Sequence, residues 1–209
     1  MKITWYGQSC FKLQNNQEIV IIDPRGPKKV GLKGPSLKAT IFILTDPDDK
    51  KVLEIKDGMI INSPGEYEVK GIMVYGIDCS RKNKNLIIYQ VEIDKIKYGF
   101  LGEINTQLKS EELEYLDGID VLFVPVGGKD ALNADKAVEI INSVEPKIVI
   151  PCCYKSASWQ TKIKTNIGTL DEFLKEMGVK KVEKLEKLLL NKKDLPTEET
   201  KVIILEPKI

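Results

Sequence analysis

The sequence predicts an α+β protein in which two facing sheets are covered by helices, a four-layer αββα sandwich. Short apolar runs separated by turn residues fill the chain up to about residue 105, and this spacing is typical of successive strands. Helical spacing of apolar residues appears only beyond that point, where it is interspersed with further short apolar runs. Strands that come first, with helices added later, favour two packed sheets over one doubly wound parallel sheet.

The strands of the first half are bounded by turns rich in proline and glycine. Asp23-Pro24 and Pro64-Gly65 are two such turns, because proline fixes φ and glycine adopts backbone conformations that other residues avoid. Between them, β-branched and aromatic residues predominate. The strands expected here span residues 3–6, 10–13, 19–22, 41–44, 59–61, 67–77, 86–93 and 97–101.

The second half alternates strands and helices. Asn133 is placed to cap a helix over residues 134–144, in which Ala137, Ile140 and Ile141 fall on one face. The stretch 182–190 is rich in Lys and Glu and has an apolar stripe, so we expect a helix with a solvated charged face. The remaining expected elements are helices over 110–115 and 170–177 and strands over 121–125, 148–150 and 202–205.

Composition restricts the class of protein. With 209 residues, 42% of them hydrophobic, the chain can bury a full core, and we expect residues 1–209 to form a single domain. Its 32 Lys and Arg against 31 Asp and Glu leave a net charge of +1, which favours neither nucleic acid nor an anionic membrane. We find no secretory stretch and no run of roughly 18 apolar residues that would suit a membrane helix. These features, with four cysteines outside any C-x-x-C motif, predict a cytoplasmic protein.

The chain contains no histidine. This excludes Ser-His-Asp and Cys-His activation of a nucleophile, since both need an imidazole as the base. It also excludes zinc sites built on a His-Glu-x-x-His helix and histidine pH switches.

Five segments together resemble the metallo-β-lactamase fold superfamily, and within it the small bacterial branch of zinc-dependent hydrolases that are similar to ascorbate-phosphate lactonases. Their order and spacing carry the resemblance, which spans nearly the whole chain. It implies the same αββα fold and a metal site at the ends of strands. The segments are 3–11, 21–24, 63–69, 124–128 and 145–151.

The metal ligands that the resemblance implies are replaced in this sequence. Segment 45–51 reads Thr-Asp-Pro-Asp-Asp-Lys-Lys where the family has Thr-His-x-His-x-Asp-His. Asp46 and Asp48 therefore stand at the two histidines of the first metal. Lys50 and Lys51 stand at the Asp and His of the second, where two ammonium groups would repel a dication.

Two further ligand motifs are changed in the same way. The family's His-Leu-Gly-Asp becomes a segment that begins with Phe100 and ends with Glu103. The closing Pro-x-His-Tyr places Cys153 at the position of the histidine. One implied ligand is thus an aromatic ring, and the bridging carboxylate is one methylene longer.

We interpret the chain first as a degenerate family member that acts as a non-catalytic binding or regulatory protein. Without imidazole ligands we expect no metal cofactor, and zinc's activation of water is then lost. A lysine can supply the missing positive charge, so we expect Lys50 or Lys51 to pair with Asp46, Asp48 or Glu103.

The alternative is a metal-dependent hydrolase of phosphoesters or lactones with an altered site. Asp46, Asp48 and Glu103, with Cys153 or Asp23, would be its ligands, and an oxygen-rich site favours Mn²⁺, Mg²⁺ or Ca²⁺ over Zn²⁺. The aspartates of segment 46–49 are equally well explained as a polar turn.

Covalent catalysis by Cys153 or Cys152 is a third class of function, although a cysteine at a strand end is usually a small buried apolar residue. The partner is expected to be a small molecule or a protein. The sequence leaves open whether the chain forms a homo-oligomer. We expect neither membrane nor nucleic acid, since glutamates interleave with the lysines of 180–193. The loop 156–164, with Trp159, is the expected place for binding.

Overall fold

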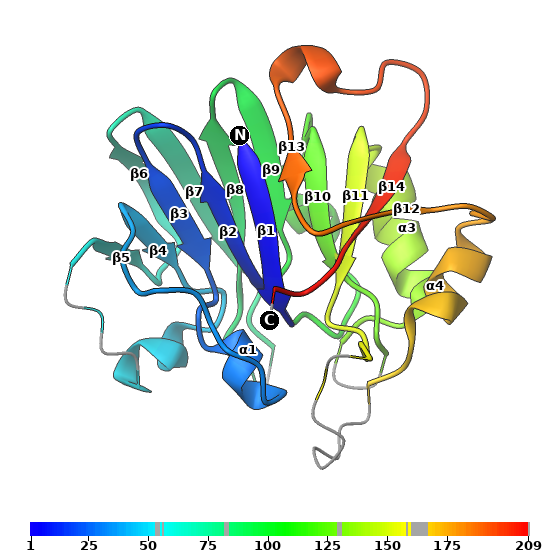
Figure 1. Ribbon diagram of the computed structural model, residues 1–209, viewed down its shortest axis with the longest axis horizontal. Helices are drawn as coiled ribbons and strands as arrows, with labels where there is room; N and C mark the ends of the chain where they lie inside the picture. Colours follow the sequence, from blue (N-terminus) through cyan, green and yellow to red (C-terminus); the bar gives the residue numbers. More distant parts are fainter. Residues whose placement is uncertain are drawn as a thin grey trace.

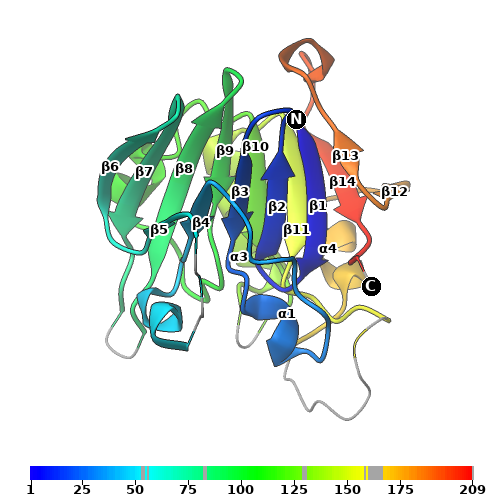
Figure 2. The same cartoon turned by 60° about the vertical axis from the view of Figure 1, so that its left-hand side comes forward.

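The computed structural model describes residues 1–52, 55, 57–81, 84–128, 131–157, 159 and 167–208. Their strands form two sheets that face each other (Figures 1 and 2). One sheet has the order β13-β1-β2-β3-β4-β5, and the other has the order β12-β14-β11-β10-β9-β8-β7-β6. The predicted α+β fold with two facing sheets is confirmed.

The first sheet consists of β1 (Lys2–Gly7), β2 (Cys10–Gln14), β3 (Ile19–Ile22), β4 (Ile41–Ile43), β5 (Met59–Ile61) and β13 (Leu188–Leu189). The second consists of β6 (Gly65–Val69), β7 (Ile72–Asp78), β8 (Ile87–Ile93), β9 (Ile96–Phe100), β10 (Val121–Pro125), β11 (Ile148–Cys152), β12 (Glu183–Leu185) and β14 (Lys201–Leu205). The helices are α1 (Gly26–Lys29), α2 (Ser110–Glu114), α3 (Ala134–Val144) and α4 (Leu170–Glu176), and the 3-10 helices are η1 (Pro47–Val52) and η2 (Lys192–Asp194).

Aromatic rings fill the space between the sheets. Phe11 of β2 lies 4.4 Å from Phe123 of β10, centroid to centroid. Phe123 in turn stacks on Phe100 of β9 at 4.5 Å with an interplanar angle of 10°. All three rings are buried. Such offset aromatic contacts add to the free energy gained from burying the apolar area, so they help to hold one sheet against the other.

The helical cover is uneven. α3 packs against β10 and α4, and its predicted apolar face, Ala137, Ile140 and Ile141, is buried. The Asn133 side chain accepts a hydrogen bond from the Lys136 backbone, as expected of an N-cap. Among the described residues, the first sheet is accompanied by the four-residue α1 after β3 and the 3-10 helix η1 after β4, and the chain between α1 and β4 runs against its outer face. Within the described chain, no helix is long and apolar enough to cross a membrane.

The helix predicted over 182–190 is wrong, because this segment forms β12 and β13. β12 pairs in parallel with β14, and β13 pairs antiparallel with β1. Lys, Glu and Leu favour helices, but propensity is a weak preference that tertiary contacts override. Here the segment satisfies the backbone groups of two sheet edges and buries Leu188.

The ends of several strands meet at one end of the sandwich. β3 and β4 are parallel in the first sheet, and β9, β10 and β11 are parallel in the second. The Ile87 backbone N–H, at the start of β8, donates to the carbonyl of Thr45 at 2.9 Å, which joins the two sheets there. We call this end, made by the segments after β1, β3, β4, β9, β10 and β11, the loop edge. It is the lower end in Figure 1, beside α1.

Candidate functional site

Asp23 is held at the loop edge by hydrogen bonds. It follows β3 with a φ of 45° and is only 4% exposed. One carboxylate oxygen accepts from the Thr45 backbone N–H at 2.7 Å, and the other accepts from the Thr45 hydroxyl at 2.7 Å. Gly102, with a φ of 61°, lets the segment after β9 approach, since a Cβ there would lie 2.3 Å from the Thr45 hydroxyl oxygen. Asp23 therefore helps to fix the segments after β3, β4 and β9 together.

Burial raises the pKa of Asp23 to about 6, because a charged carboxylate loses solvation in the protein. Hydrogen bonds from Thr45 and Ser9 act in the opposite direction, and the negative charge of Glu103 adds to the increase. Asp23 is thus held where a negative charge is costly.

A lysine of α1 meets the carboxylate after β9. The Lys29 ammonium lies 3.0 Å from Oε2 of Glu103, and the two side chains are 34% and 22% exposed. Burial opposes the charged ammonium, but Glu103, Asp49 and Asp23 outweigh it and raise the pKa of Lys29. The other oxygen of Glu103, Oε1, is buried and has no hydrogen-bond partner among the described residues.

A second ion pair joins the start of α1 to η1. The Arg25 guanidinium lies 2.6 Å from the Asp49 carboxylate, which is 4% exposed. Gly26 follows Arg25 and packs closely, since a Cβ there would lie 3.2 Å from the Cβ of Gln8. Arg25 and Lys29, at the two ends of α1, therefore pair with one carboxylate after a strand of each sheet. The short helix lies at the loop edge.

The lysine that meets Glu103 is not one of the two that the sequence suggested, and a pairing of Lys51 with an aspartate of segment 46–49 stays a prediction. Glu103 pairs with Lys29, whereas Lys50 is exposed and the side chain of Lys51 lies outside the described part of the chain. Asp46 accepts a hydrogen bond from the Asp48 backbone at 3.0 Å, which is a turn geometry typical of aspartate.

Two other predicted positions lie in the interior. Phe100 is 1% exposed and belongs to the aromatic core. Cys153 is also 1% exposed, and its sulfur lies 3.8 Å from that of Cys152. Burial, Cys152 and the carboxylate of Glu103 raise the pKa of Cys153 well above its usual value. A thiolate nucleophile is therefore disfavoured at this position.

Among the described residues, the side chains at the loop edge are not arranged as a metal centre. Nowhere in the described chain do three or more Asp, Glu or Cys side chains form a group that could hold a metal ion. The carboxylate of Asp23 is engaged by Thr45, and one oxygen of Glu103 by Lys29. The candidate set Asp46, Asp48, Glu103 and Cys153 is thus not assembled as a ligand cluster in this structure.

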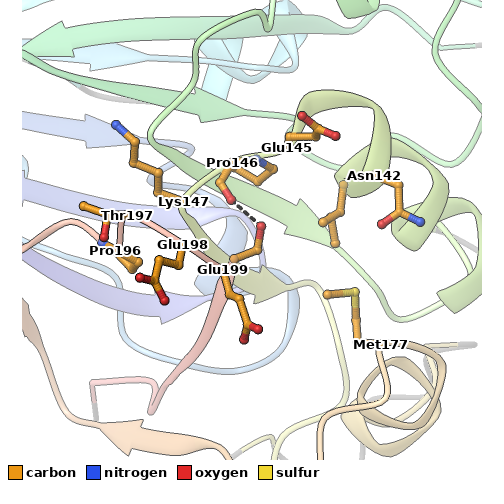
Figure 3. A pocket seen from close by; sticks show the side chains of 11 residues that line it. Asn142, Glu145, Pro146, Lys147, Met177, Pro196, Thr197, Glu198 and Glu199 are labelled. Carbon is orange, nitrogen blue, oxygen red and sulfur yellow. Dashed lines mark hydrogen bonds between the residues drawn. The ribbon is translucent and has the colours of Figure 1, made fainter.

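A hollow of about 630 Å³ lies at the opposite end of the strands, where β11 and β14 begin (Figure 3). Glutamates from α3's end and from the loop before β14 project around it, and the Thr200 hydroxyl donates to the Pro146 carbonyl at 2.6 Å. Its lining contains none of the predicted site residues. The lining residues are Ile141, Asn142, Glu145, Pro146, Lys147, Met177, Pro196, Thr197, Glu198, Glu199 and Thr200.

Trp159 lies beside α1 at the loop edge. It is 7% exposed and packs with Val30, Leu32 and Ile167. Of the loop 156–164, in which binding was expected, residues 158 and 160–164 lie outside the described part of the chain. The ring therefore covers the segment that follows α1.

Two facing sheets with this strand order, and a loop edge at which several strands end together, define a metallo-β-lactamase fold. The chain belongs to the beta-lactamase superfamily, because the family model described as "Beta-lactamase superfamily domain" matches residues 2–153. The recognition made from the sequence motifs is confirmed.

Relatives and solved structures agree with this family. A UPF0173 protein of Pyrococcus abyssi is 24% identical over 178 residues, which cover 74% of this chain and 83% of the relative. A UPF0173 metal-dependent hydrolase of Thermoplasma acidophilum is 22% identical over 190 residues, covering 75% and 84%. A candidate Zn-dependent hydrolase of the metallo-β-lactamase superfamily from Thermotoga maritima has a TM-score of 0.79 at 27% identity, covering 98% and 97% of the two chains.

Proposed function

We propose that this protein is a non-hydrolytic member of the superfamily, a binding or regulatory protein whose loop edge is stabilised by ion pairs instead of a dinuclear metal centre. The observation that carries this proposal is the contact of Lys29 with Glu103 at 3.0 Å. An ammonium group there supplies the positive charge that a metal would otherwise bring to the carboxylate.

Ligand chemistry supports the proposal. Zinc hydrolases hold their ion with imidazole or thiolate ligands and leave one position open for water. This chain has no imidazole, and Phe100 lies in the core where the family has a ligand. Cys153 is held as a buried thiol, so it offers no ready thiolate.

The alternative proposal is a metal-dependent hydrolase with an altered site. The names of the Thermoplasma and Thermotoga relatives favour it. So does the buried Oε1 of Glu103, a carboxylate oxygen that has no partner in the described chain and could face a cation or water. The two proposals differ in whether purified protein holds a metal.

Protein produced without a histidine tag is expected to contain no stoichiometric metal, even after incubation with excess Zn²⁺, Mn²⁺, Mg²⁺ or Ca²⁺ and desalting. The reason is that the implied ligands are replaced by Asp, Lys, Phe and Cys. Elemental analysis measures this directly, and the Thermotoga relative prepared in the same way is the comparison. One bound metal per chain, together with metal-dependent hydrolysis of a phosphoester or lactone, would refute the non-hydrolytic proposal.

The variant Lys29→Met is expected to lose about 1 kcal/mol of stability, because the Glu103 carboxylate is left partly buried without its cation. In the background of Glu103→Gln the same change should cost less, so the two residues should show a coupling energy. Chemical denaturation of the two single variants and the double variant measures it.

Lys28→Met is the matched control for this cycle. Lys28 is the exposed neighbour in α1, and no ion pair of its side chain is found among the described residues. Equal losses for Lys28→Met and Lys29→Met, or strictly additive effects with Glu103→Gln, would argue against an ion pair that replaces a metal.

We also propose that the protein acts in the cytoplasm on a small molecule or a protein partner. Its four cysteines are all free and buried, which suits a reducing compartment. Whether the protein forms a homo-oligomer stays an open question, and sedimentation analysis tests it.

A further inference from the structure

A second polar feature lies on the outer face of the first sheet, away from the aromatic core. Side chains of Lys2, Thr4 and Tyr6 alternate along β1 with core residues, and Thr4 pairs across to Lys12 of β2. The chain from 206 to 208 runs beside β1, where the Lys208 N–H donates to the Trp5 carbonyl at 2.8 Å. This face therefore gathers residues from both ends of the chain, as the position of the C-terminal segment beside β1 shows (Figure 1).

Two adjoining hollows share Lys208 on this face. One, of about 450 Å³, is lined by Lys2, Thr4, Glu186, Lys187, Glu206, Pro207 and Lys208. The other, of about 410 Å³, is lined by Tyr6, Lys12, Lys33, Gly34, Pro35, Ser36 and Lys208. The second hollow thus contains three lysines and two hydroxyls but no carboxylate, while the glutamates lie in the first.

The lysines of the second hollow make no close ion pairs in the described part of the chain. Across the described chain, no salt bridge within 4.0 Å involves Lys12, Lys33 or Lys208. Burial, and then the positive charges of Lys2 and Lys208, lower the pKa of Lys12. Lys208 is exposed, and its ammonium lies 5.8 Å from the centre of the Tyr6 ring, which places the charge beside the hollow.

We propose that this hollow binds the phosphate group of a phosphorylated small molecule. Lys12, Lys33 and Lys208 would neutralise the dianion, and the hydroxyls of Ser36 and Tyr6 line the same space as hydrogen-bonding groups. A hollow of about 410 Å³ lies in the size range of small-molecule sites and leaves room for an organic part beside the phosphate. The hollow borders the loop edge on the outer face of the first sheet, but its lining includes neither Lys29 nor Glu103, so the proposal does not depend on the proposed function.

The variant Lys12→Met tests this site, with pyrophosphate as the probe. Isothermal titration at low ionic strength is expected to show saturable binding at one site per chain. Lys12→Met and Lys33→Met should each weaken binding about ten-fold or more, because each removes one of three charges. Lys136→Met, which removes an exposed lysine on α3, should leave the affinity unchanged.

Lys12→Met is expected to fold normally, since the change removes a repelled charge and keeps an apolar stem, and a thermal unfolding curve checks this. Absence of saturable binding up to about 10 mM pyrophosphate would overturn the proposal. So would equal affinity in the Lys12→Met and unchanged proteins. A short oligonucleotide is added as a competitor of pyrophosphate. If it displaces the pyrophosphate at a far lower concentration, counted per phosphate group, and needs the same lysines, the occupant is a nucleic-acid backbone and the small-molecule assignment is overturned.

Discussion

The variant Asp23→Asn is expected to gain stability relative to the unchanged protein as the pH rises from about 4 to about 7, by about 3 kcal/mol. The pKa of Asp23 is about 6 in the folded protein, against 3.8 for a free aspartate. Between these values the unfolded chain has released its proton while the folded chain still holds it. Rising pH therefore favours unfolding through this group, and asparagine removes that contribution.

The measurement is the free energy of unfolding of both proteins by chemical denaturation across this pH range. The difference between the two is the quantity of interest, because carboxylates with lowered pKa, such as Asp120, act in the opposite direction in both proteins. Asp46→Asn, at a partly exposed position on the same edge, is the matched control. Its free energy of unfolding should run parallel to that of the unchanged protein. If the Asp23→Asn difference is independent of pH, the buried carboxylate is not the proton-binding group that we describe.

The variant Phe100→His is expected to lose about 2 to 4 kcal/mol of stability and to gain no metal. It restores the residue that the family implies at this position. In this structure, however, the imidazole would replace a ring stacked on Phe123 and would enter the aromatic core. The neighbouring carboxylate, Glu103, is paired with Lys29, so a single histidine does not rebuild a ligand set.

Phe100→Leu separates the loss of the ring from the burial of a polar group, and it should cost about 1 kcal/mol. Chemical denaturation compares the two variants, and zinc titration of Phe100→His checks for a metal. Equal stability of the histidine and leucine variants, or one equivalent of zinc bound by the histidine variant, would contradict the core position of Phe100.

Sequence patterns predicted the parts of the fold that depend on local periodicity. The helix Ala134–Val144 and its Asn133 cap have the expected bounds, since a 3.6-residue apolar repeat needs only one face to pack against. The segment 182–190 was predicted wrongly because its residues favour a helix in isolation. Its strands form only where the edges of β1 and β14 offer unpaired backbone groups, and no local pattern contains that information.

The sequence indicated which segments meet at the loop edge but not the interactions that the side chains make there. The motifs after β3, β4, β9 and β11 indicated the loop edge, because ends of neighbouring strands meet there. Lys29 was missed, since it lies 74 residues from Glu103 and reaches it from a helix of only four residues. The adjacent signal was the Gly26-Pro27 pair, which marks a turn or a helix start but does not say which carboxylate a following lysine meets.

The segment 206–208 also bears on the strand edge at β1. An exposed strand edge can pair with a strand of another chain and begin aggregation. In β1, Lys2 and Ile3 pair with β13, and the carbonyl of Trp5 accepts a hydrogen bond from the Lys208 N–H. The Glu206 N–H reaches the Leu185 carbonyl of β12 at 2.8 Å, so the same three residues connect one sheet to the other. The segment 206–208 thus occupies backbone groups on this edge that would otherwise be open to a strand of another chain.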